Sequence, residues 1–157
     1  MRKIDLCGGH GKPTGYESVD LKNSDIVADL NNQWPFKDGE VGLFRAHDAL
    51  EHLKNPIHTM KEIYRCLSPK GWLLSLTPST DGRGAFCDPT HVSFWNSFSL
   101  RYYTHKLQAQ YIDTPVKFQL NRIKDFFPSE YHKFHNIVYV KADLLKFSGR
   151  TPGLIEI

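Results

Sequence analysis

The sequence has few cysteines, and their arrangement excludes two kinds of cross-link. There are three among 157 residues, Cys7, Cys66 and Cys87, and they are far apart with no C-x-x-C spacing. An odd and scattered set of this kind predicts neither a disulfide framework nor a structural zinc site. We therefore expect a reducing environment, which favours a cytoplasmic protein.

Long apolar runs are also missing from the sequence. No stretch approaches the length of about 20 apolar residues that a membrane-spanning helix needs. The N-terminal residues MRKIDLCGGHG contain too few apolar side chains for the core of a signal peptide. We therefore expect neither a membrane span nor a signal peptide.

The chain lacks a strong net charge, which argues against electrostatic attraction to nucleic acid. The formal charge is +3, with ten basic and ten acidic residues up to Pro78 and ten basic and seven acidic residues after it. So small an excess does not predict a nucleic acid partner. Aromatic residues make up 13% of the chain. We expect those between Phe86 and Phe134 to build the core and edge of a small domain rather than a stacking surface.

The length predicts one domain, residues 1–157, that buries about 70% of the surface of its unfolded form. A helix is expected to begin at Asn55 and Pro56, and the turn signal SPKG at 68–71 ends it. The apolar run at 72–78 is typical of a strand covered on both faces. Before the helix, short strands separated by turns are expected at 3–7, 16–20, 25–30 and 41–46.

A strand, a helix and a second strand in succession predict parallel pairing and an α/β fold. The first two predicted strands are joined by about eight residues, fewer than parallel neighbours usually need. We therefore expect either an unusual, trimmed pairing or a segment that is merely extended chain. Further along, we expect a long loop at 79–96, a helix near Ser97, antiparallel strands at 116–127 and 136–147, and a surface strap or disordered tail at 148–157.

The stretch LCGGHGKPTGYESVD, residues 6–20, places a glycine-rich turn between the first two predicted strands. Such a turn lets a ligand approach the backbone, because glycine has no Cβ and adopts positive φ at little cost. A triphosphate-binding loop would need glycine at Leu6 and Ser or Thr at Pro13, and neither is present. The dinucleotide fingerprint fails because Gly15 comes one position late and leaves no room for a helix.

Two acids near the ends of predicted strands point instead to an adenosine cofactor. Asp20 can accept hydrogen bonds from both ribose hydroxyls, a geometry that fixes an adenosine without a phosphate. Asp29 can accept from the amino group of a purine while Leu30 packs against its flat face.

Several segments together resemble a small class I S-adenosylmethionine-dependent methyltransferase of the type 11-like kind. They span roughly residues 3–105 and read DLCGG, GYESVDL, VADLNNQWPFKDGEVGLFRAHDALEHL, PIHTMKEIYRCLSPKGWLLSLTP and DPTHVSFW. The most specific parts are AHDALEHL, SPKGW and DPTH. The resemblance implies a Rossmann-like sheet that is mostly parallel and ends in an antiparallel strand pair, here trimmed in its N-terminal half.

The resemblance also implies S-adenosyl-L-methionine as cofactor. Cys7 stands where the family usually has its first motif glycine, and the helix that normally follows that motif is absent. Motif positions assign the methionine part to Gly8 and Gly9, the ribose to Asp20, the adenine to Asp29 and Leu30, and the sulfonium end to Ala46 and His47. The predicted cofactor-binding residues are Cys7, Gly8, Gly9, Asp20, Leu21, Asp29, Leu30, Ala46 and His47.

Methyl transfer to a hydroxyl benefits from a general base, and histidine suits that role near neutral pH. The predicted catalytic residues are His47, His91 and Asp88, the last two from the DPTH sequence of the long loop. His47, Glu51 and His52 have the spacing H-x-x-x-E-H, which matches neither H-E-x-x-H nor H-x-x-E-H. We therefore expect no metal, and we expect Glu51 and His52 to brace the turn into the next helix.

The sequence thus predicts methyl transfer to a small-molecule or sugar-like hydroxyl or amine acceptor. The alternative, motivated by Cys7 and the missing helix, is a non-catalytic module that binds an adenosine cofactor or a partner on a methyltransferase scaffold. Nucleic acid methylation is a weaker possibility, because no Asp/Asn-Pro-Pro-Tyr/Phe motif follows the fourth predicted strand. The sequence does not specify an oligomeric state.

Overall fold

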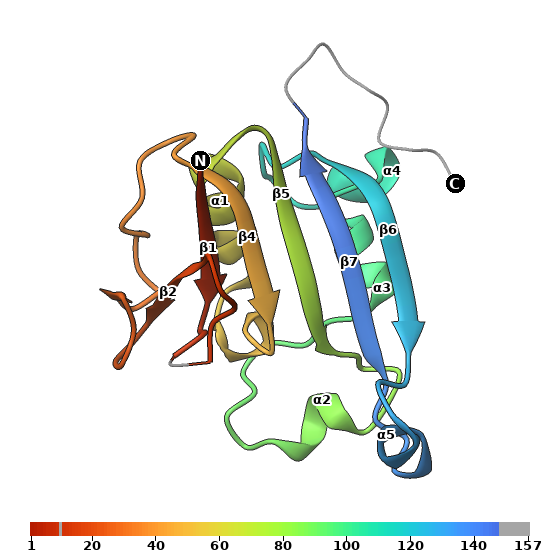
Figure 1. Ribbon diagram of the computed structural model, residues 1–157. Coiled ribbons are helices and arrows are strands. Elements are labelled where there is room, and N and C mark those ends of the chain that lie inside the picture. Colours follow the sequence, from red (N-terminus) through yellow and green to blue (C-terminus); the bar gives the residue numbers. More distant parts are fainter. Residues whose placement is uncertain (10, 148–157) are drawn as a thin grey trace.

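The computed structural model describes residues 1–9 and 11–147, so the tail predicted at 148–157 lies outside the described residues. Seven strands form one sheet in the order β3-β2-β1-β4-β5-β7-β6 (Figure 1). Strand β7 is antiparallel to β5 and β6, and the other neighbouring pairs are parallel. The predicted α/β fold with a C-terminal antiparallel pair is confirmed. The strands are β1 (Arg2–Leu6), β2 (Glu17–Asp20), β3 (Ile26–Val27), β4 (Val41–His47), β5 (Leu67–Pro78), β6 (Phe118–Phe126) and β7 (Tyr139–Lys146).

Six helices fill the connections between strands after β4 in the described chain. They are the 3-10 helix η1 (Leu50–His52) and the α-helices α1 (Pro56–Cys66), α2 (Gly84–Cys87), α3 (Ser97–Arg101), α4 (Lys106–Ala109) and α5 (Glu130–Phe134). Among the described residues, no helix combines the length and the apolar character needed to cross a membrane.

The β1–β2 connection contains no helix in its described residues, yet the two strands pair in parallel. Ile4 lies opposite Glu17, and Leu6 lies opposite Val19. The backbone N–H of Cys7 donates to the carbonyl of Val19 at 2.9 Å, which keeps the chain against β2 as it leaves β1. The trimmed pairing is therefore confirmed, and the possibility of merely extended chain is wrong for β2.

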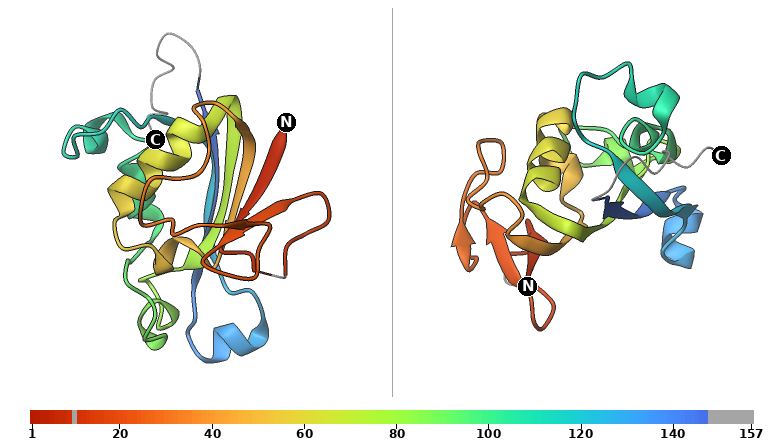
Figure 2. Two further views of the ribbon diagram at one scale, coloured as in Figure 1. Left: turned by 90° about the vertical axis from the view of Figure 1, so that its left-hand side faces the viewer. Right: turned by 90° about the horizontal axis from the view of Figure 1, so that it is seen from above.

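Helices α1, α3 and α4 lie on one side of the sheet in both views of Figure 2. No described helix packs along the opposite side. Ile4 and Phe44 are buried on the helix-covered face. Side chains alternate between the two faces of a strand, so the next residues, Asp5 and Arg45, point to the open face. There the carboxylate of Asp5 pairs with the guanidinium of Arg45 at 2.7 Å. The open face is thus partly polar where a typical doubly wound sheet would be apolar.

Helix α1 forms where the sequence predicts it. The Asn55 side chain accepts from the backbone N–H of His58 at 3.0 Å, and Pro56 occupies the first turn. Its apolar stripe, which includes Met60 and Ile63, is fully buried against the sheet. Strand β5 begins directly after the helix, earlier than predicted, with a register shift against β4 over residues 68–71.

Three predicted segments differ from the structure. The strand expected at 25–30 is wrong except for β3, because Asp29 accepts from the backbone N–H of Asn31 and turns the chain. The long loop expected at 79–96 contains α2, and the polar connection between the late strands contains α5. Short helices of this length carry little periodic signal in a sequence.

The segment at 28–40 crosses from β3 to β4 without a helix and supplies aromatic residues to the core. Phe44 is fully buried and meets Trp34 and Phe36 edge to face, with ring centroids 5.4 and 5.8 Å apart. The indole N–H of Trp34 donates to the carbonyl of Leu30 at 2.9 Å, which keeps the segment folded onto the sheet. This aromatic cluster holds β3, β4 and the residues that follow β3 in place.

Replacing Phe44 by alanine should lower the free energy of unfolding by about 3–5 kcal/mol, because the change leaves a cavity and removes two aromatic contacts. Urea denaturation measures the loss. Phe134→Ala is the control, since Phe134 is 85% exposed and its removal should cost less than about 0.5 kcal/mol. Equal effects of the two changes would contradict the proposed role of the cluster.

Candidate functional site

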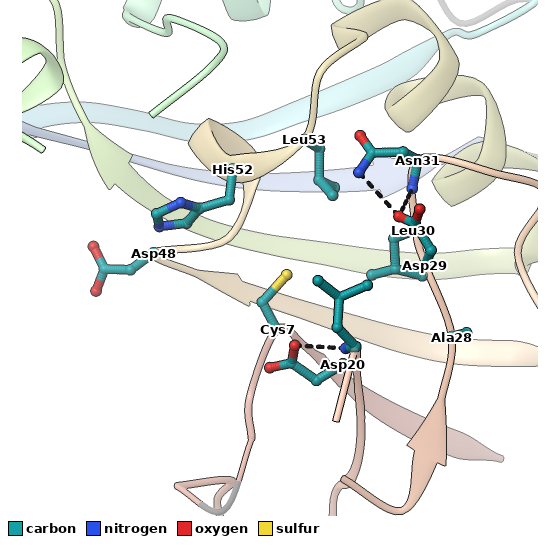
Figure 3. Close-up of a pocket in the computed structure, with 10 residues that line it drawn as sticks. Cys7, Asp20, Ala28, Asp29, Leu30, Asn31, Asp48, His52 and Leu53 are labelled. Atoms are coloured by element: carbon teal, nitrogen blue, oxygen red, sulfur yellow. Dashed lines mark hydrogen bonds between the residues drawn. The ribbon is translucent and has the colours of Figure 1, made fainter. Parts of the chain in front are cut away.

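The carboxyl ends of β1, β2 and β4 meet at one edge of the sheet. The strand order reverses between β1 and β4, and ligands of open α/β sheets bind outside the carboxyl ends at such a point. A first cavity of about 340 Å3 lies there, within the range of roughly 300–1,000 Å3 that is usual for small-molecule sites. Its lining, drawn in Figure 3, comprises Cys7, Asp20, Leu21, Ala28, Asp29, Leu30, Asn31, Asp48, His52 and Leu53.

Asp20 ends β2 and presents its carboxylate at this first cavity. Its Oδ1 accepts a 2.7 Å hydrogen bond from the backbone N–H of Leu21, drawn as a dashed line in Figure 3. A carboxylate has about four acceptor positions, so this bond leaves capacity for the hydroxyls of a ligand. Gly9, with φ at +47°, brings the neighbouring loop close, and a Cβ there would lie 3.8 Å from Oδ2 of Asp20.

Asp29 and Leu30 line the same cavity from the turn after β3. Oδ1 of Asp29 accepts from the backbone N–H and the side-chain amide of Asn31, both at 2.9 Å. These hydrogen bonds lower the pKa of Asp29, so it is a carboxylate at neutral pH. Leu30 is almost fully buried and forms an apolar wall. The pair supplies the acceptor and the apolar surface that the sequence predicts for a purine.

A second cavity of about 320 Å3 adjoins the first and shares Asp48 and His52 with it. The phenol of Tyr139 donates to Oδ1 of Asp48 at 2.9 Å, which fixes that carboxylate between the two spaces. The predicted catalytic residues Asp88 and His91 lie on the wall of the second cavity. Its remaining lining is Glu51, Pro78, Gly84, Cys87, His132, Ile137 and Tyr139.

The loop at 79–96 is held firmly against η1. The backbone N–H groups of Val92 and Ser93 both donate to the carbonyl of Glu51, at 2.8 and 3.1 Å. The hydroxyl of Ser93 donates to the carbonyl of Leu50 at 2.8 Å. These bonds place His91 beside η1, although the two segments are some forty residues apart in the sequence.

Acidic residues contribute to the lining of both cavities. The first has Asp20, Asp29 and Asp48, the second has Asp48, Glu51 and Asp88, and the described lining of neither includes a lysine or an arginine. Such a field favours cationic or neutral ligands over phosphates. The charges of the two cavities and the glycine spacing at residues 6–20 therefore both argue against nucleoside triphosphates and dinucleotides as ligands.

The model of a family described as a methyltransferase domain matches residues 1–114, nearly three quarters of the chain. The chain belongs to this methyltransferase family. Comparison with the sequences of curated proteins finds no match.

Solved methyltransferases share the fold of this family member. An S-adenosylmethionine-dependent methyltransferase from Methanosarcina mazei has 13% identity and a TM-score of 0.63, covering 94% of this chain and 93% of that one. A second, from Mesorhizobium loti, has 12% identity and a TM-score of 0.62, covering 92% and 90%. Phosphoethanolamine N-methyltransferase 2 of Haemonchus contortus, solved with S-adenosyl-L-methionine, has 11% identity and a TM-score of 0.63, covering 94% and 49%. At these identities the likeness shows the fold alone.

Cys7 has the backbone conformation that explains why glycine is usual at this position of the methyltransferase motif. Its φ is 54°, in the left-handed region that side chains rarely adopt. Its sulfur points into the first cavity in Figure 3. Burial, together with the nearby carboxylates of Asp20, Glu51 and Asp5, raises the pKa of the Cys7 thiol to about 12. The thiol is therefore a neutral wall of the cavity at physiological pH.

Several predicted site residues of this methyltransferase lie outside the two cavities. His47 bonds Nδ1 to the guanidinium of Arg45 at 2.8 Å and lines neither cavity, so the geometry gives no support to its predicted role as general base. Ala46 is fully buried and also lines neither cavity. Gly8 packs against the side chain of Asp5, because a Cβ there would meet Oδ2 of Asp5 at 2.3 Å.

Sequence reasoning missed other residues that the structure brings to the site. Asn31, Asp48 and Leu53 line the first cavity, and Glu51 and His52 also enter the cavity walls. Asn55 caps α1, as the sequence predicts. The available sequence signal was the position of Asp48, an acid just after the strand predicted at 41–46.

The thiol of Cys7 should resist alkylation although it borders a cavity. With its pKa raised from 9.0 to about 12, the thiolate fraction near pH 8 falls by roughly a thousandfold. Treatment with iodoacetamide followed by peptide mass spectrometry should modify the exposed Cys87 well before Cys7. In urea all three cysteines should react alike, and comparable native rates for Cys7 and Cys87 would contradict the result.

Proposed function

We propose that this methyltransferase-family protein binds S-adenosyl-L-methionine in the first cavity and transfers its methyl group to a small-molecule or sugar-like acceptor in the second. The acceptor atom is a hydroxyl oxygen or an amine nitrogen. The observation that carries the proposal is the pair of adjoining, acid-lined cavities at the point where the strand order reverses. They share Asp48 and His52, so ligands in the two spaces would approach one another there.

The residues of the first cavity fit this cofactor. Asp20 offers free acceptor positions for the ribose hydroxyls, and Leu30 offers an apolar wall for the adenine. The absence of lysine and arginine from the described lining suits a cofactor that bears a positive sulfonium. When bound, S-adenosyl-L-methionine supplies an activated methyl group, so the protein has to align the acceptor and exclude water.

His91 is placed to take a proton from an acceptor. Its Nδ1 faces the carbonyl oxygen of Ala85 at 3.0 Å, and because a carbonyl only accepts, Nδ1 carries the hydrogen. Nε2 is then the basic nitrogen, and the Asp88 carboxylate 3.8 Å away would stabilise its protonated form. His91 is nearly buried at the wall of the second cavity, and two of the predicted catalytic residues, His91 and Asp88, are neighbours there.

The acidic lining also bears on the acceptor. Phosphate-rich acceptors would be repelled by Asp48 and Asp88, which disfavours a nucleic acid substrate. Burial raises the pKa of Glu51, so this residue contributes less to the repulsion. A neutral hydroxyl compound or an amine meets no such repulsion. The acceptor class, like the cytoplasmic setting and the single-domain organisation, stays a prediction.

Isothermal titration calorimetry with S-adenosylhomocysteine tests the cofactor site. Asp20→Ala should weaken binding at least tenfold, because hydrogen bonds to a charged group contribute about 1.5–3 kcal/mol. Asp113→Ala is the matched control, since Asp113 is an exposed acid outside both cavities and should bind as the unaltered protein does.

The outcome decides between the two functions that the sequence left open. No binding of S-adenosylhomocysteine at millimolar concentration would contradict the proposed cofactor site. Binding that depends on Asp20, with no methyl transfer to panels of hydroxyl and amine acceptors, would favour the non-catalytic module. Radiolabelled methyl transfer that is lost in Asp20→Ala would establish the enzyme.

A further inference from the structure

Three residues with metal-binding side chains converge where the second cavity meets η1. One ligand atom each from Glu51, His52 and His91 lies within 4.8 Å of the other two. Glu51 and His52 come from the turn after β4, and His91 comes from the loop at 79–96. The rings of the two histidines lie 5.0 Å apart between centroids. The H-x-x-x-E-H spacing in the sequence covers His47, Glu51 and His52. The structural cluster contains His91 in place of His47, so the spacing did not predict it.

Each histidine already has the outer partner that metal-binding histidines commonly have. Nδ1 of His91 donates to the carbonyl of Ala85 at 3.0 Å, and Nδ1 of His52 faces the carbonyl of Thr90 at 3.3 Å. The Thr90 hydroxyl also lies 3.2 Å from Nδ1 of His52, but it donates its hydrogen to Asp88. Because a carbonyl oxygen accepts only, both Nδ1 atoms carry hydrogen and both Nε2 atoms keep a free lone pair. Donation of one ring nitrogen to a carbonyl fixes the ring and its tautomer while the other nitrogen binds the ion.

Glu51 supplies an independent sign that a ligand belongs here. Glu51 is buried, with only 2% of the residue exposed. Oε2 accepts from the hydroxyl of Thr77 at 2.6 Å, but Oε1 is buried without a hydrogen-bond partner. A buried carboxylate oxygen without a partner costs free energy of folding, which a bound cation would recover. Glu51 lines the second cavity, so a cation bound to Oε1 would lie at the wall of that cavity.

We propose that Glu51, His52 and His91 form a binding site for a divalent transition-metal ion. Two imidazole nitrogens and one carboxylate oxygen favour Zn2+, Co2+ or Mn2+ over Mg2+, which prefers oxygen ligands. Three protein ligands leave coordination positions open toward the cavity. Asp88 is not one of the three proposed ligands, although its Oδ2 lies 3.8 Å from Nε2 of His91. Its Oδ1 accepts from the hydroxyl and the backbone N–H of Thr90 and so holds the loop.

Such an ion narrows the acceptor class, and this part of the inference rests on the proposed function. With the ion bound, Nε2 of His91 is a ligand and no longer accepts a proton, so the ion replaces His91 in activating the acceptor. An acceptor hydroxyl that ligates the ion loses its proton to water more readily. Its oxygen then forms the bond to the methyl carbon, while the carbon–sulfur bond of the donor breaks and leaves its electron pair on sulfur. We therefore assign a hydroxyl, rather than an amine, as the group that is methylated.

Titration of the chelator-treated protein with Co2+, followed by visible absorbance, tests the site. One Co2+ per chain should bind, and His91→Ala and Glu51→Gln should each weaken binding at least tenfold. Glu51→Gln is nearly isosteric and keeps an acceptor for Thr77, so it separates loss of a ligand from loss of the fold. His58→Ala is the control, because His58 bonds to the carbonyl of Asn32 away from the cluster and should leave Co2+ binding unchanged.

The possible results point in different directions. No Co2+ binding at millimolar concentration, or binding that is equal in the unaltered protein and both variants, would overturn the metal site. Calorimetry with S-adenosylhomocysteine on the same samples reports separately on the cofactor cavity, so either proposal can fail while the other stands. Catechol added to the Co2+ form should change its spectrum, and an unchanged spectrum would overturn the assignment of a hydroxyl acceptor.

Discussion

Two backbone hydrogen bonds to the carbonyl of Glu51 are the constraint on which the second cavity depends. They come from Val92 and Ser93, and they tie the end of the loop at 79–96 to the turn after β4. The other end of the loop is secured where Ser79 bridges to Trp95, which is itself buried. With both ends fixed, His91 and Asp88 lie on the cavity wall as parts of an ordered structure. Positions held this way lose little entropy when a ligand binds.

The N-terminal half supplies a reduced version of the cofactor side. A helix after β1 would normally cover one face of the sheet and present its N-terminus to a ligand. Here a loop tied to Val19 replaces it, and the Asp5–Arg45 ion pair occupies the open face. S-adenosyl-L-methionine carries no phosphate, so the proposed binding at Asp20 and Leu30 does not require a helix N-terminus.

The acidic character of both cavities links the cofactor and acceptor sides. Asp48 faces both spaces and is oriented by Tyr139 from the antiparallel strand β7. Strand β7 therefore contributes to the site as well as to the sheet. A cationic cofactor, a metal ion and a neutral acceptor are compatible with the same field, whereas phosphate ligands are not.

The predictions that succeeded rest on short-range patterns. The cap at Asn55, the helix it begins and the position of Asp20 at a strand end follow from neighbouring residues, so the sequence alone specifies them. The strand expected at 25–30 failed because the Asp29 side chain turns the backbone, and α2 and α5 were missed because helices of one turn leave little periodic trace.

The sequence by itself determined the fold class, through local periodicity, and the family, through the resemblance of several segments to class I methyltransferases. It also placed Asp20 at the end of a strand, because that position follows from neighbouring residues. Tertiary structure alone decided that His47 lines neither cavity and that Glu51, His52 and His91 meet. Which side chains converge depends on how a loop docks on a distant turn, and that docking is fixed by backbone hydrogen bonds. Nearly every residue carries the same backbone donor and acceptor, so the pattern of side chains in the sequence does not predict which backbone hydrogen bonds dock the loop.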